Sequence, residues 1–125
     1  MLGNQGQAAK QTSLLNPISA AATANATSAW TDVRDAEGDL VFTNHVGALT
    51  GSIVWTIEHA SDGSGTGAVA ITPNEGAYAA VTANQVQKRT VPAGAVLGWV
   101  RVIGTIVTGP VLVEANVMYH PKYTT

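Results

Sequence analysis

Alternation of apolar and polar residues over short runs is the feature that most restricts what this chain can fold into. In the run VLVEANVMYH, Val111, Val113 and Tyr119 fall on one side of an extended chain, and Glu114 and His120 fall on the other. A strand with one buried face requires this period of two. A second run, SIVWTIEH, places three large side chains on one face: Ile53, Trp55 and Ile57. These runs predict half-buried β-strands.

Turn-forming residues separate the alternating runs at short intervals. Asp62-Gly63, Pro92-Ala93-Gly94 and Thr108-Gly109-Pro110 are examples, and such residues favour tight changes of chain direction. Further candidate strands are ISAAATA, DLVFTNHV, AVAIT, YAAVT, QVQKRTV and LGWVRVIGTIV. About eight or nine short strands without an intervening helix predict an all-β, antiparallel β-sandwich or barrel. We predict a jelly roll, with an immunoglobulin-like sandwich as the alternative.

The chain of 125 residues has the size of one compact domain. Residues 1–17 are rich in Gln, Gly, Ala, Asn and Ser, and they show neither helical nor strand periodicity. We interpret them as an extended N-terminal arm, either an ordinary frayed end or a segment that reaches another subunit. Residues 18–125 are predicted to form the single β-sandwich domain.

Composition excludes several classes of partner and site. Only 11% of the residues are charged and 46% are apolar, which suits a protein whose flanks are held by neighbours. The six cations are scattered and the net charge is −2, so no nucleic-acid partner is expected. The lack of cysteine removes disulfides and thiolate chemistry.

The chain carries no membrane or export pattern that we recognise. The apolar runs are far shorter than the ~20 residues that span a bilayer, and the N-terminus does not resemble a secretory signal. No membrane partner is expected, and the protein is expected to stay in the compartment where it is made.

A glycine-rich block, SDGSGTG, follows the strand that contains Trp55. A phosphate-binding loop would lead into a helix, but the next residues, AVAIT, alternate like a strand. A calcium loop needs several carboxylates, and Asp62 is the only one between Glu58 and Glu75. The block is therefore predicted to be a flexible hairpin connection at the surface, opened by Asp62-Gly63.

No catalytic, cofactor-binding or metal site is predicted, and the chain is not expected to be an enzyme. The three histidines lack the spacing of a zinc site, and no G-x-S-x-G motif is present. Carboxylates crowd the stretch TDVRDAEGDL around Arg34, which we interpret as a solvated corner with a weak ion pair. The residues considered are His45, His59, His120, Asp32, Asp35, Glu37 and Asp39.

The three tryptophans raise the alternative of a small carbohydrate- or host-surface-binding module. Trp55 and Trp99 lie within strong strands beside Ile57 and Val100, so we predict that both pack in the core. Trp30, among small and polar neighbours, is expected to be the more exposed indole.

Three segments in order, DVRDAEGDLVF, GALTGSIVWTIEHASDG and GWVRVIGTIVTGPVLVEANVM, resemble the small capsid decoration, or cement, proteins of tailed bacteriophages. In that group, E-H-S-x-D-G-type hairpins and a Y/W-V-R-V-x-x-T-V-T-G strand recur. The similarity covers about residues 28–119, and the run Trp99–Thr105 is its best single match.

This resemblance implies a structural virion protein without an active site or a cofactor. Such proteins commonly fold as jelly rolls, form homotrimers and bind the major capsid protein at three-fold positions of an HK97-like shell. The expected location is the capsid surface of the virion, after synthesis in the cytoplasm of the bacterial host. The arm, residues 1–17, is then expected to order on contact with the capsid or a neighbouring subunit.

Overall fold

The computed structural model of the chain describes residues 10–20 and 25–122, with the backbone alone for residues 17–20. It contains short and long strands and a single-turn 3-10 helix. The elements are β1 (Lys10–Ala20), β2 (Ala26–Thr27), β3 (Thr31–Asp32), β4 (Ala36–Leu49), β5 (Ile53–Ala60), β6 (Val69–Ile71), β7 (Gln85–Pro92), η1 (Ala93–Ala95), β8 (Trp99–Ile106) and β9 (Val111–Pro121).

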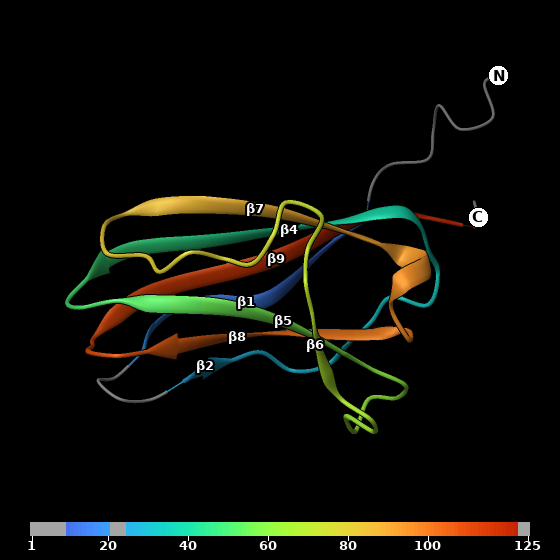
Figure 1. Cartoon of the computed structure of the whole chain (residues 1–125), viewed down its shortest axis with the longest axis horizontal. Helices are drawn as coiled ribbons and strands as arrows, with labels where there is room; N and C mark the ends of the chain where they lie inside the picture. The colour runs from blue at the N-terminus through green and yellow to red at the C-terminus, as the bar shows by residue number, and fades with distance from the viewer. Residues whose placement is uncertain (1–9, 21–24, 123–125) are drawn as a thin grey trace, which may run out of the picture.

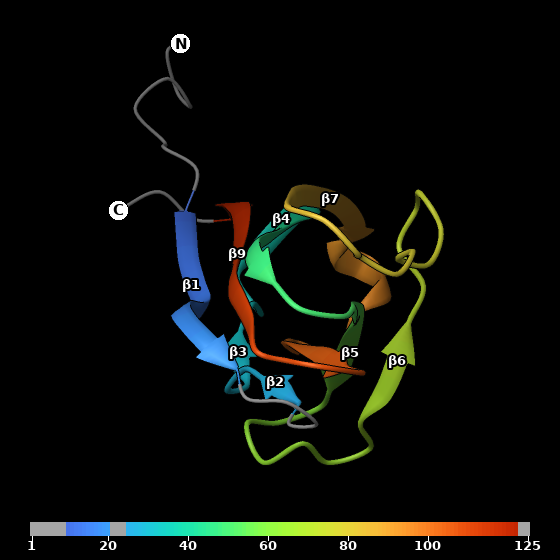
Figure 2. The same cartoon turned by 90° about the vertical axis from the view of Figure 1, so that its left-hand side faces the viewer.

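The strands form two antiparallel sheets that face each other (Figures 1 and 2). Sheet A has the order β1-β9-β4-β7, and sheet B has the order β2-β8-β5-β6 with β3 also paired to β8. The predicted all-β antiparallel sandwich is confirmed. The strand order differs from the ABED and CFG sheets of an immunoglobulin-like sandwich, and it is consistent with the predicted jelly roll.

The core lies between the sheets and is built from the inward side of each alternating run. In β4, Leu40 and Phe42 are fully buried, whereas the intervening Val41 is half-buried on the other side of the sheet. The runs SIVWTIEH and VLVEANVMYH likewise bury alternate residues. These are Ile53, Trp55, Ile57, Val111, Val113, Ala115, Val117 and Tyr119. The predicted core faces of these strands are therefore confirmed.

The N-terminal boundary of the domain differs from the prediction. Residues 10–17, assigned to the arm, belong to strand β1, which pairs with β9 from Lys10 opposite Tyr119 onward. Leu14 lies in the core. The register shifts twice along this pairing, between Ser13 and Leu15 and again between Leu15 and Ile18. Because each shift interrupts the alternation of faces, β1 shows no strand periodicity in its sequence. Residues 1–9 of the predicted arm lie outside the described residues.

The run YAAVT, predicted as a strand, instead lies in the long connection from β6 to β7, which crosses from sheet B to sheet A (Figure 2). Its only pairing is an isolated bridge between Val81 and Ile53. Tyr78 and Val81 are both buried and belong to the core between the sheets, whereas Ala79 and Ala80 are exposed. We call residues 72–84 the crossover. Of the predicted run ISAAATA, residues 18–20 end β1 and residues 21–24 lie outside the described residues.

Candidate interaction face

The predicted carboxylate corner forms at one end of the sandwich and is held by ion pairs. The guanidinium of Arg34 donates two hydrogen bonds to Asp32, from Nε to Oδ1 at 2.9 Å and from Nη2 to Oδ2 at 2.7 Å. The hydrogen bonds from the Arg34 side chain hold the pKa of Asp32 below its ordinary value. The expected Arg34 ion pair is confirmed, and its exposure makes its contribution to stability small.

Asp35 anchors both ends of the described chain. The hydroxyl of Tyr119 donates to its Oδ1 at 2.9 Å, and the ammonium of Lys10 lies 3.7 Å from its Oδ2. The backbone N–H of Lys122 donates to the Asp35 carbonyl at 2.6 Å. These contacts give Asp35 a structural role. Asp35 also shares an open hollow of about 430 Å³ with Asp32, and the cations Lys10 and Arg34 complete its lining.

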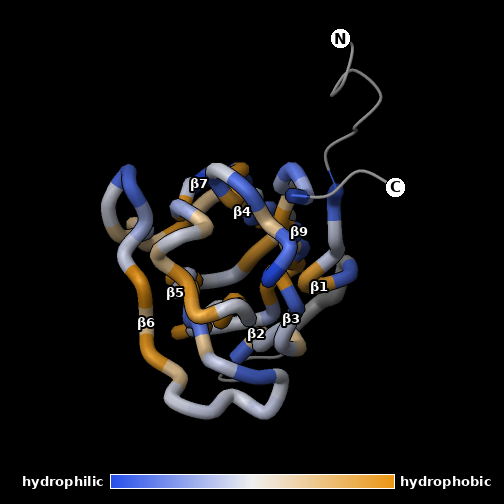
Figure 3. Tube along the Cα trace, turned by 90° about the vertical axis from the view of Figure 1, so that its right-hand side faces the viewer, coloured by the Kyte–Doolittle hydropathy of each residue, from blue (hydrophilic) through white to orange (hydrophobic). Residues whose placement is uncertain are grey.

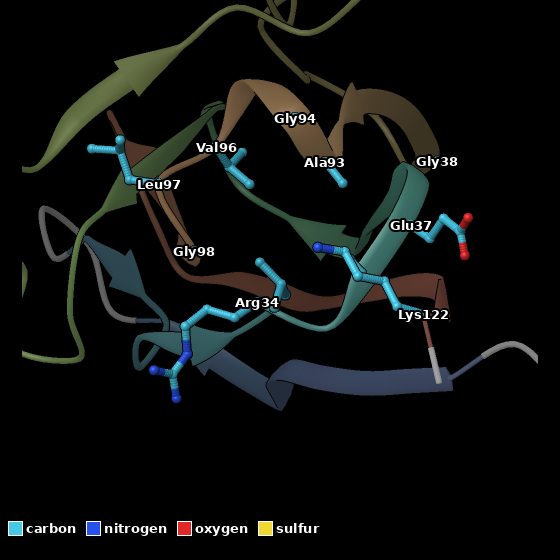
Figure 4. Close-up of a pocket in the computed structure, with 11 residues that line it drawn as sticks. Arg34, Glu37, Gly38, Ala93, Gly94, Val96, Leu97, Gly98 and Lys122 are labelled. Carbon is cyan, nitrogen blue, oxygen red and sulfur yellow. The ribbon is translucent and has the colours of Figure 1, made fainter. Parts of the chain in front are cut away.

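A hollow of about 400 Å³ lies beside this corner, between β4 and η1. Figure 4 shows the Lys122 side chain reaching across it, while the Glu37 carboxylate points away. Its walls are largely small residues such as Ala36, Ala93 and Gly98. Glu37 is the one carboxylate among its lining residues, and no Ser, Thr, Cys or His lines it.

The structure separates the three histidines. His45 on β4 lies 3.5 Å from Glu114, and His120 is exposed on β9, both in sheet A. His59, on β5 in sheet B, accepts the N–H of Leu97 through Nδ1. Within residues 10–20 and 25–122, no three His, Asp or Glu side chains come close enough to share a metal ion.

The glycine-rich block connects β5 to β6 as a hairpin, as predicted. Its single carboxylate turns back onto the loop itself. Asp62 Oδ1 accepts the N–H groups of Ser64 and Thr66, and Oδ2 accepts the Thr66 hydroxyl at 2.6 Å. The Thr66 hydroxyl bond, the strongest of these effects, lowers the pKa of Asp62. Asp62 therefore orders the loop from within.

The same loop packs against two tryptophans on the outer face of sheet B. In Figure 2 the loop runs below this sheet. A Cβ on Gly63 would lie 3.0 Å from the Trp99 ring, and a Cβ on Gly65 would lie 2.8 Å from Trp30 Nε1. The Arg101 guanidinium also lies over the Trp30 ring, 4.5 Å from its centre, and Arg101 binds Glu58. Glycine is needed here because the loop backbone touches the indoles.

One of the three tryptophan predictions is wrong. Trp55 is buried, as predicted, and shares its face with Ile57. Trp99 is only half-buried and lies beneath the Arg34 guanidinium at 5.4 Å, so its assignment to the core is wrong. It precedes the buried Val100, and adjacent strand residues face opposite sides. Trp30 is half-buried beneath the loop.

Replacing Gly65 with alanine is expected to lower the free energy of unfolding by about 2 kcal/mol, measured by denaturant titration. Gly65 has φ +85°, and its new Cβ would press on Trp30. Gly67→Ala is the matched control, because Gly67 also has a positive φ but no atom within 4 Å of an added Cβ. It should cost only about 1 kcal/mol. Equal losses would contradict the contact between loop and indole.

The outer face of sheet A is broad, and Figure 2 shows no other described segment lying over it. We use this name for the outward residues of its four strands. They are Gln11, Ser13, Glu37, Asp39, Val41, Thr43, His45, Val86, Lys88, Thr90, Pro92, Leu112, Glu114, Asn116, Met118 and His120. Six of these sixteen residues are ionisable, namely Glu37, Asp39, His45, Lys88, Glu114 and His120, and the other ten are neutral.

Apolar side chains protrude from this face. Val86, Leu112 and Met118 are 51%, 43% and 38% exposed. Hollows of about 190 and 310 Å³ flank Leu112. Other exposed apolar residues lie apart, such as Val69 on the short edge strand β6, which is apolar along its length in Figure 3. Glu114 and Asn116 separate Leu112 from Met118 along β9, and His45 lies between Val86 and Glu114. A non-obligate interface is about as apolar as the rest of a protein surface, so we take this uncovered face as the candidate contact surface.

Sequence reasoning missed this face, although its signal is present. In VLVEANVMYH, Leu112 and Met118 occupy the polar side of an otherwise clean alternation. A half-buried strand places charged or polar residues at such positions when the face meets only water.

No family model matches the chain, and no curated protein matches it either. The described residues include no helix of the length and apolar character needed to cross a membrane.

Proposed function

We propose that this protein is a structural virion protein that binds the outside of an icosahedral phage capsid and stabilises it. The outer face of sheet A, broad and studded with Val86, Leu112 and Met118, is the observation that supports the proposal most. The sandwich architecture and the resemblance of residues 28–119 to decoration proteins point the same way. A protein that binds only the assembled shell lowers the free energy of that state by mass action.

The size of the face bears on the number of copies required. Four strands about 4.8 Å apart, over about eight residues of about 3.3 Å each, present roughly 500 Å². A stable protein–protein interface needs about 800 Å² from each partner. One copy therefore binds the shell weakly, and a trimer at a three-fold position joins three such contacts through effective concentration.

The trimer has a direct test. Light scattering of the purified chain should give about three times the chain mass of 12.8 kDa, and the value should hold on dilution to low micromolar concentration. A monomer at high concentration would contradict the homotrimer but would leave binding to the capsid open.

The contact with the capsid is tested by charge placed on the face. The double variant Leu112→Glu, Met118→Glu should bind expanded shells of the phage that encodes the chain at least about tenfold more weakly, because each carboxylate must be desolvated on contact. Bound copies per shell are counted after sedimentation over a range of protein concentrations.

Val107→Glu is the matched control, since Val107 is 65% exposed in the β8–β9 hairpin and outside the face. It should bind as the unmodified chain does. Absence of binding by the unmodified chain would overturn the proposed function, and equal loss in both variants would overturn the assignment of the face.

The alternative function, a carbohydrate- or host-surface-binding module, needs exposed aromatic platforms. Trp30 and Trp99 lie on one face of sheet B, but the glycine loop and two guanidinium groups cover them. This covering counts against an aromatic platform, and specific binding to a glycan array would support the alternative.

A further inference from the structure

The peptide bond between Asp62 and Gly63 belongs to a chemically labile type. In an Asp-Gly sequence, the glycine nitrogen can attack the side-chain carboxyl group of the aspartate, because glycine has no side chain to obstruct the approach. The other aspartates, Asp32, Asp35 and Asp39, are each followed by a residue with a side chain, and the sequence contains no Asn-Gly pair. Asp62 is therefore the residue of this chain that is most open to such an attack.

The fold requires both residues of this pair at the start of the β5–β6 loop. A Cβ on Gly63 would lie 3.0 Å from the Trp99 ring, so a larger residue is disfavoured at that position. The Asp62 carboxylate accepts the N–H groups of Ser64 and Thr66 at 2.9 and 3.1 Å and the Thr66 hydroxyl at 2.6 Å. The labile pair is thus built into the structure of the loop.

The attacking nitrogen is free, whereas the carboxyl group is held. In the part of the chain that the structure describes, no hydrogen bond uses the Gly63 N–H, and Gly63 is exposed to water. Both carboxylate oxygens of Asp62 accept hydrogen bonds. Attack would disrupt this arrangement, since one oxygen must leave as water and the other becomes a neutral carbonyl. The Thr66 hydroxyl bond also lowers the pKa of Asp62, which reduces the protonated fraction from which water leaves.

We propose that Asp62 is a site of isoaspartate formation and that the Thr66 hydroxyl slows the reaction. The Gly63 nitrogen forms a bond to Cγ of Asp62, and the hydroxyl of the protonated carboxyl group leaves with the amide proton as water. Water then opens the succinimide ring at either carbonyl, which returns aspartate or gives isoaspartate. The sum is a rearrangement that needs no co-reactant besides water. This inference does not rest on the proposed function.

Isoaspartate would change the loop that packs against the tryptophans. The main chain would run through Cγ of Asp62 and gain one methylene group, and the free carboxylate would move to the former backbone carbonyl carbon. The loop would then no longer fit the close contact between Gly63 and Trp99. We therefore expect the tryptophan fluorescence to change as isoaspartate accumulates.

Ageing of the purified full chain in water enriched in heavy oxygen tests the site. The chain is kept at body temperature and neutral pH for weeks, and peptide mapping by mass spectrometry locates isoaspartate. Opening of the ring adds one oxygen from the solvent, so labelled isoaspartate is expected at Asp62 before any other position. Isoaspartate that forms first elsewhere, or none at Asp62 even in the chain kept in concentrated urea, would overturn the proposal.

Two variants test the role of the hydroxyl. Thr66→Val removes it and should speed isoaspartate formation at Asp62 by at least about tenfold, the effect of losing one hydrogen bond to a charged group. Ser64→Ala is the matched control, because Ser64 donates to Asp62 through its backbone N–H. It should age at the rate of the unmodified chain.

Circular dichroism at the incubation temperature shows whether each variant is folded. Equal rates in folded Thr66→Val and in the unmodified chain would overturn the role of the hydroxyl. If Thr66→Val does not fold, the unmodified chain decides the question, because it should react at least about tenfold faster in concentrated urea than in its folded state. Equal rates in these two states would show that the hydrogen bonds to Asp62 give no protection, which would overturn the proposal.

Discussion

Gly51→Ala is expected to lower the free energy of unfolding by about 3–4 kcal/mol. Gly51 lies in the turn between β4 and β5 with φ +86°, a conformation that costs an L-residue about 1–2 kcal/mol. The added Cβ would lie 2.5 Å from both the Cβ and the carbonyl oxygen of Thr108. Since one of these contacts is backbone, the turn between β8 and β9 must move. Denaturant titration followed by tryptophan fluorescence measures the loss.

Gly38→Ala separates the two causes of this loss. Gly38 has φ +79°, but an added Cβ would meet no atom within 4 Å. Its replacement should therefore cost only about 1 kcal/mol, the conformational part alone. If Gly51→Ala costs no more than Gly38→Ala, the result would contradict the close contact between Gly51 in the β4–β5 turn and Thr108 in the β8–β9 turn.

Phe42→Ala is expected to lower the free energy of unfolding by about 3–5 kcal/mol. Phe42 lies on the inner side of β4, is 0% exposed and belongs to the core between the sheets. Its truncation removes a large buried surface and leaves a cavity that the two sheets cannot fill. Thermal and denaturant unfolding, monitored by circular dichroism, give the change.

The adjacent residue provides the control for Phe42. Val41 points to the outer face of sheet A and is half-buried, so Val41→Ala should cost less than about 1 kcal/mol. A loss of similar size at both positions would mean that β4 is buried on both faces, against the two-layer arrangement.

The architecture could be predicted because alternation reports which side of a strand is buried. The tryptophans show how far this signal reaches. Trp55 shares its parity with Ile57, and both are buried. Trp99 is adjacent to Val100, so the burial of Val100 places Trp99 outside. The side on which a strand residue lies depends on whether it is an even or an odd number of positions from a buried residue. Being next to an apolar residue does not determine that side. By this rule, Trp99 lies on the outer side.

Other features could not be predicted because they depend on contacts between distant residues. Strand β1 lost its periodicity through two register shifts against β9, and nothing in residues 10–17 alone reveals that partner. The glycine block was predicted as a hairpin from Asp62-Gly63, but its contacts with Trp30 and Trp99 arise only when the sheet is assembled. The outer face of sheet A likewise combines residues of four strands.

The anchoring of both chain ends at Asp35 has a consequence for engineering. Lys10 and Lys122 both contact Asp35, so the first and last described residues lie close to each other at one end of the sandwich. A short linker from Lys122 to Lys10 would therefore allow the chain to be opened elsewhere, for example within the β5–β6 hairpin. Circular permutants of this kind generally succeed where termini are close together and new ends fall in surface loops.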